Sequence, residues 1–114
     1  MAKLPEETIT RVLNLQRQLL ERIDDVMTTD FVLFDRFGET QETIDYFELL
    51  QNATERAESY NSRLYTTLKQ IYPAQPVASR ASLELLARYI EETEATVEAI
   101  TASVAEIRRD FNLL

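Results

Sequence analysis

The last third of the chain carries an apolar repeat that continues without a break to the final residue. Its members alternate in steps of three and four: Leu83, Leu86, Ile90, Thr93, Val97, Ile100, Val104, Ile107, Phe111 and Leu114. This heptad spacing is typical of a helix that packs along its whole length against neighbouring helices, and Thr93 is its one polar member. With Ser79 as the N-cap, the repeat predicts a helix over about residues 79–112.

The middle third keeps the same spacing over nine positions, so it predicts a second long helix, over about residues 41–72. Gly38 can close the preceding helix in a left-handed turn, and Thr40 can cap the next one. Pro73 ends the helix, because a proline pushes the residue before it away from helical angles. The nine positions are Thr43, Tyr46, Leu50, Ala53, Ala57, Tyr60, Leu64, Thr67 and Ile71.

The first third carries two apolar rows, and it predicts a helix over about residues 6–36. The first row is Ile9, Val12, Gln16, Leu19, Ile23, Val26 and Leu33, and the second is Leu13, Leu20, Met27 and Phe34. Two adjacent rows suit a helix that packs against two neighbours at once, so we expect both rows to be buried. The β-branched stretch 28–32 could equally cap a new short helix, so a kink or a break near residues 28–30 is left open as an alternative to a continuous helix.

Few residues in the chain can form tight turns. One glycine and three prolines leave room for about two turns, too few for a β-rich fold. The connections between the predicted helices are short, so helices adjacent in sequence are expected to be antiparallel. The sequence thus predicts an all-α fold, an up-down-up three-helix bundle that forms one domain over residues 1–114. A broken first helix would make the bundle four-helical.

Residues suited to catalysis are scarce, because the chain has no histidine and no cysteine. The commonest general base, neutral imidazole ligands and thiolate metal sites are therefore excluded. A cluster of carboxylates lies on one outward row of the last helix: Glu84, Glu91, Glu94 and Glu98. We interpret it as a solvated face, paired with Arg56 or Arg63, rather than as a Mg²⁺ site. No catalytic residue, cofactor or metal site is predicted.

Three polar residues occupy seam positions that would ordinarily be aliphatic: Gln16, Tyr60 and Thr93. In an up-down-up bundle they converge near mid-length, where a buried polar layer can fix the register of the helices. The alternative, a site for a small ligand or water, stays open.

The aromatic residues divide between the two ends of the predicted bundle. All five phenylalanines lie at the end with the first turn, where we expect them to close the core. Towards the other end, a group of residues at or beyond the edges of the seams predicts an exposed contact patch, since tyrosine is common at interfaces. This patch consists of Tyr65, Tyr72, Leu85 and Tyr89.

The net charge of −8 is spread evenly along the chain. With no basic half or tail, we expect neither a nucleic-acid partner nor an anionic membrane partner. The chain has no apolar leader at its start and no apolar run of the length, about 18 residues, that spans a membrane. A cytoplasmic protein is therefore expected.

Three functions remain open. The first is a non-catalytic protein–protein interaction module, whose partner could be a second copy in a two-fold dimer. It is favoured by apolar residues outside the seams: Leu15, Leu49, Tyr65, Tyr72, Leu85, Tyr89 and Leu113. The second is an acidic inhibitor or regulator that occupies a basic surface of its target. The third, least favoured, is an enzyme that uses carboxylates with a divalent metal.

Overall fold

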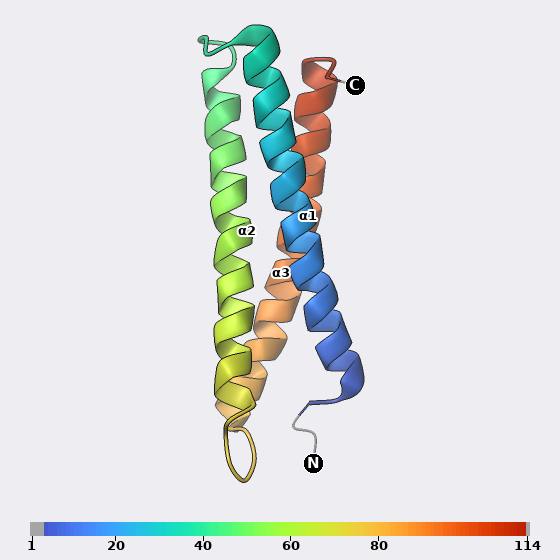
Figure 1. Ribbon diagram of the computed structural model, residues 1–114, viewed down its shortest axis with the longest axis vertical. Helices are drawn as coiled ribbons and strands as arrows, with labels where there is room; N and C mark the ends of the chain where they lie inside the picture. The colour runs from blue at the N-terminus through green and yellow to red at the C-terminus, as the bar shows by residue number, and fades with distance from the viewer. Residues whose placement is uncertain (1–3, 114) are drawn as a thin grey trace.

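The computed structural model describes residues 4–113, which form three long α-helices joined by two short connections. Helices α1 (Glu6–Phe37) and α3 (Arg80–Asp110) run in the same direction, and α2 (Ile44–Ile71) runs antiparallel to both (Figure 1). Each helix packs against the other two, in a rod that measures 57 × 20 × 17 Å. The predicted all-α, up-down-up three-helix bundle is therefore confirmed.

The first connection is built as its residues predict. Gly38 follows α1 with φ 68° and ψ −172°, and its N–H donates to the Phe34 carbonyl at 2.8 Å. Thr40 and Thr43 then cap each other, since each hydroxyl oxygen accepts the N–H of the other residue, at 3.2 and 2.9 Å. This reciprocal arrangement satisfies two N–H groups that a helix start leaves without partners. Thr40, expected as the cap of α2, caps the turn of residues 41–43 that leads into the helix, whose own N-cap position is Thr43.

The second connection ends at Ser79, whose hydroxyl oxygen accepts the N–H of Ser82 at 3.1 Å. The predicted N-cap of α3 is therefore confirmed. Helix α2 ends at Ile71, two residues before Pro73, as the helix-breaking effect of proline requires.

Helix α1 is continuous through residues 28–30, which settles the alternative that the sequence left open. Thr29 is fully buried there, and its hydroxyl donates to the Asp25 carbonyl one turn earlier, at 2.8 Å. This bond satisfies the hydroxyl inside the helix, so a β-branched polar residue is accommodated without a break.

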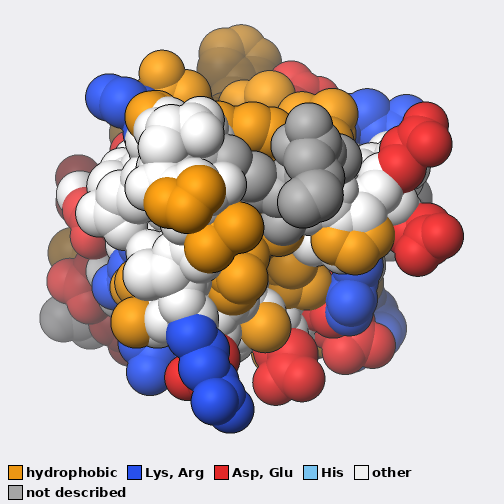
Figure 2. Space-filling view, turned by 90° about the horizontal axis from the view of Figure 1, so that it is seen from below, with side chains coloured by type: hydrophobic (Ala, Val, Ile, Leu, Met, Phe, Trp, Pro, Cys, Tyr) orange, Lys and Arg blue, Asp and Glu red, His pale blue; other side chains and the backbone are white. Residues whose placement is uncertain are grey.

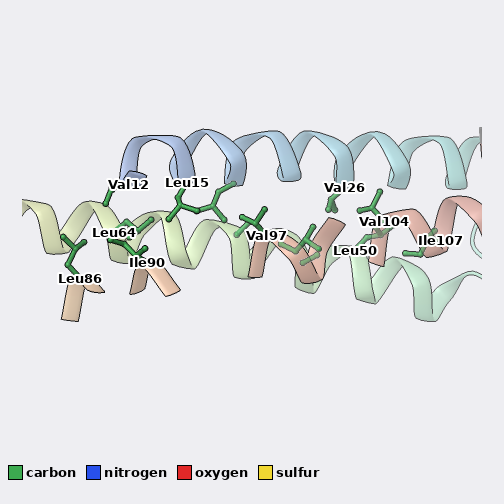
Figure 3. Close-up of a cluster of buried hydrophobic side chains, with 14 of the residues drawn as sticks. Val12, Leu15, Val26, Leu50, Leu64, Leu86, Ile90, Val97, Val104 and Ile107 are labelled. Carbon is green, nitrogen blue, oxygen red and sulfur yellow. The ribbon is translucent and has the colours of Figure 1, made fainter. Parts of the chain in front are cut away.

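The core runs the length of the bundle between the three helices. Figure 3 shows buried side chains from all three turning towards a shared centre. Helix α2 contributes two alanines, Ala53 and Ala57, whose small side chains allow close packing. The aliphatic residues labelled there are Val12, Leu15, Val26, Leu50, Leu64, Leu86, Ile90, Val97, Val104 and Ile107.

The seam of α1 differs from the predicted one. Leu15 is buried, whereas Gln16 and Ile23 are only half-buried. Leu113 is buried too, so Leu15 and Leu113 are not apolar residues left outside the core, as the sequence suggested. The buried row of α1 includes Leu15 and Thr29 in place of Gln16 and Ile23, a choice that the heptad spacing alone does not specify.

The phenylalanines gather near the first connection, but they do not close the core as a group. The rings of Phe37 and Phe111 lie 5.4 Å apart between centroids, and that of Tyr46 lies 4.9 Å from Phe111. Phe31, Phe34 and Phe37 are nevertheless exposed to solvent. The expectation of core closure is therefore wrong for these three residues of α1.

Candidate functional site

The carboxylates of α3 form a solvated face, but their partners differ from the predicted ones. Glu94 accepts two hydrogen bonds from Arg11 of α1, at 2.6 and 3.1 Å, and they raise the pKa of Arg11 above its ordinary value. Within residues 4–113, neither Arg56 nor Arg63 forms an ion pair with this face. Over the same range, no group of three Asp or Glu side chains lies close enough together to hold a metal ion.

The three residues of the predicted polar layer differ in burial and in their hydrogen-bond partners. Thr93 is fully buried, while Gln16 and Tyr60 are half-buried. The Tyr60 hydroxyl donates to Glu92 at 3.0 Å, and Arg63 stacks over the Tyr60 ring at 4.9 Å from its centroid. In the part of the chain that the structure describes, no hydrogen bond joins the three predicted residues. A shared layer that fixes the register stays a prediction.

The Thr93 hydroxyl has no hydrogen-bond partner within the described chain. The buried threonines Thr29, Thr67 and Thr96 differ from it, because each donates to the carbonyl four residues earlier, at 2.7 to 2.8 Å. A buried hydroxyl without a partner costs free energy, since it gives up its bonds to water.

Replacing Thr93 with valine should therefore raise the free energy of unfolding by about 1 kcal/mol, because the shape is kept and the unpaired hydroxyl is lost. Thr67→Val, which removes a bonded hydroxyl, should not stabilise the protein. Urea unfolding followed by circular dichroism measures both changes. A loss of stability in Thr93→Val would show that this hydroxyl has a partner in solution.

The predicted contact patch is divided between two faces. Tyr65 is exposed on α2, and Tyr72, the C-cap residue of that helix, is exposed seven positions later. Leu85 and Tyr89 are half-buried on α3 and line a depression between α2 and α3, in which Tyr65 and Tyr72 take no part. Hydrophobic side chains do gather at the centre of this end of the bundle, with charged ones around them (Figure 2). That the four residues form one contact site stays a prediction.

The second row of α1, which we name the outer row, is exposed. Between 55 and 59 % of the surface of Leu13, Leu20, Met27 and Phe34 is open to solvent, and Phe31 beside them is 71 % exposed. The expectation that both rows of α1 pack against its neighbours is therefore wrong.

The position of the outer row follows from helix geometry. Each of its residues comes directly after a buried one: Val12, Leu19, Val26 and Leu33. Successive residues in an α-helix are about 100° apart around the axis. Both neighbours of α1 lie on the side that the buried row faces, so the outer row is turned away from the core.

An apolar groove lies between α1 and α2, near the first connection. Met27 and Phe34 line it from α1, and Ile44 and Phe47 line it from α2. The rings of Phe34 and Phe47 meet edge to face, 6.1 Å apart between centroids. Two members of the outer row are thus walls of the groove.

Carboxylates surround this groove: Asp30, Glu39, Glu48 and Glu55. No lysine or arginine is among the residues that line it. None of the four carboxylates forms an ion pair with any residue from 4 to 113. Thr54 also lines the groove, and its buried hydroxyl has no hydrogen-bond partner within residues 4–113. We name this feature the acid-rimmed groove.

Comparison with models of known protein families, with curated proteins and with solved structures finds no match to this chain. Within residues 4–113, no helix is both long enough and apolar enough to cross a membrane.

Proposed function

We propose that this protein is a non-catalytic interaction module that holds a protein partner against helix α1. The observation that carries the proposal is the outer row, four large apolar side chains in heptad spacing that the chain itself leaves exposed. Monomeric proteins seldom leave a large contiguous apolar patch open unless it is used. Heptad spacing is also what a second helix needs in order to pack alongside.

The composition of the chain supports the non-catalytic part of the proposal. The chain has no histidine, the commonest general base, and no cysteine, an intrinsically strong nucleophile. An interaction module needs none of these groups. That the protein works in the cytoplasm stays a prediction.

A second candidate is the acidic regulator that occupies a basic surface of its target. The four carboxylates of the acid-rimmed groove favour it, because they have no ion-pair partner within residues 4–113. Such a regulator would bind mainly through charge, so its binding should be lost as salt rises. A module that binds through the outer row should keep most of its affinity.

Site-specific photo-cross-linking in cells of the source organism tests the interaction proposal. A photoreactive phenylalanine analogue at Leu20 should give a discrete protein adduct, because this side chain lies in the middle of the outer row. The same analogue at Ala102, exposed on α3, is the matched control and should not give that adduct. An adduct with twice the mass of the chain would identify the partner as a second copy. The same adducts from both positions, or none from either, would contradict the proposal.

A further inference from the structure

We propose that the acid-rimmed groove binds an amphipathic helix from another protein, one that carries lysine or arginine beside its apolar stripe. This inference rests on the proposed interaction function and names the surface and the chemical class of the partner.

The shape of the groove suits a helix. It lies between two antiparallel helices, and its apolar walls come from both of them. A helix laid along it would complete a four-helix bundle, the usual way in which such a pair buries a shared apolar face. The outer row continues along α1 beyond the groove through Leu20 to Leu13, so a helix of about three heptads would remain in contact.

The charge of the groove determines which helix it accepts. Complementary charges at the edge of an interface favour the right partner, and like charges reject the wrong one. Four carboxylates border the groove with no cation among its lining residues, so lysine or arginine on the flanks of a bound helix would neutralise them. A helix with acidic flanks would be repelled.

The same charges oppose a second copy of this chain as the occupant. In a two-fold dimer the same patch of each protomer meets its counterpart. Two acid-rimmed grooves face to face would bring eight carboxylates together, in a chain whose net charge is already −8. An anionic membrane surface is disfavoured for the same reason.

Binding of designed peptides by isothermal titration calorimetry tests the proposal. The probe is a helical peptide of about three heptads with leucine at its a and d positions and lysine on both flanks. The comparison peptides are the same sequence with glutamate flanks and a scrambled sequence of the same composition. We expect the lysine peptide to bind, and the other two to bind at least about ten-fold more weakly.

Two matched double variants separate binding in the groove from general attraction to an acidic protein. Glu48→Gln/Glu55→Gln removes two charges at the groove, and Glu91→Gln/Glu98→Gln removes two exposed charges on α3. The first should weaken peptide binding about ten-fold, since each ion pair at the surface contributes modestly. The second should change it less than about two-fold, because exposed charges on another face are screened.

A matched apolar pair tests the walls of the groove. Met27→Ser should weaken binding of the lysine peptide, whereas Leu49→Ser should not, although the two side chains are equally exposed at 55 and 53 %. Because both residues lie at the surface, both variants should keep their helical circular dichroism signal and melting temperature.

Four results would overturn the proposal. Equal binding of the lysine and glutamate peptides would refute the role of charge. Equal losses in the two glutamine variants would show attraction to the whole acidic surface. A dimer in light scattering whose association Met27→Ser abolishes would make a second copy the occupant. If the Leu20 cross-link persists while no peptide binds the groove, the interaction function stands and this assignment of its partner fails.

Discussion

Replacing Leu19 with alanine is expected to lower the free energy of unfolding by about 3 kcal/mol, whereas Leu20→Ala should change it by less than about 0.5 kcal/mol. These leucines are neighbours in the sequence. The side chain of Leu19 is fully buried between the helices, so its truncation leaves a cavity in the core. The side chain of Leu20 is 59 % exposed, so its truncation leaves none.

Urea unfolding followed by circular dichroism gives the free energy of unfolding of both variants. If its slope against urea concentration is unchanged, the variants keep the compactness of the folded and unfolded states. Binding should show the opposite pattern. In the photo-cross-linking and peptide experiments, Leu20 is expected to matter for binding, and Leu19 is not. Similar losses of stability in the two variants would mean that the outer row is packed in solution.

Gly38→Ala is expected to lower the free energy of unfolding by about 2 kcal/mol, which is the second-largest effect. Gly38 has φ 68° and ψ −172°, a region of backbone conformation that essentially only glycine adopts. No atom lies within 4 Å of the position that an added Cβ would occupy, so the cost comes from the backbone and not from a collision.

Glu39→Ala, at the next residue of the same connection, is the matched control and should change stability by less than about 0.5 kcal/mol. Thermal and urea unfolding of the two variants check the difference. Equal stability of Gly38→Ala and the parent would show that the connection adopts another conformation. In that case Glu39 and Ile44, which follow Gly38, would be displaced from the groove.

The helices themselves could be predicted because their signals are local. The heptad spacing, the capping residues Thr40 and Ser79 and the breaking effect of Pro73 each act within a few residues. The predicted bounds of all three helices therefore agree with the structure to within about three residues. The sequence left open whether the first helix breaks near residues 28–30, and the structure shows that it continues, with the Thr29 hydroxyl bonded to the Asp25 carbonyl.

The proposed binding surface could not be predicted in the same way, because it depends on how each helix is rotated about its axis. The two rows of α1 are both apolar and both in heptad spacing, so periodicity alone does not tell which one is buried. The sequence did hold a signal in its adjacent apolar pairs, such as Leu19–Leu20 and Val26–Met27. In this bundle both neighbours of α1 lie on one side, and only the first member of each pair is buried.

The partner of Glu94 was missed for the same physical reason. Its pairing with Arg11 rather than with Arg63 depends on the relative rotation and level of α1 and α3. Neither quantity is contained in the spacing of residues along one helix. Arg63 instead lies over the rings of Tyr60 and Tyr89, at 4.9 and 5.8 Å from their centroids.

A water-soluble paramagnetic probe tests most directly whether the outer row of α1 faces solvent in the free protein. In methyl spectra recorded by nuclear magnetic resonance, the signals of Leu20 and Met27 should broaden strongly as the probe is added, because both side chains are more than half exposed. The signals of Leu19 and Val26, which are buried, should persist. Equal protection of Leu20 and Leu19 would contradict this, because the outer row would then be covered and unavailable to a partner helix.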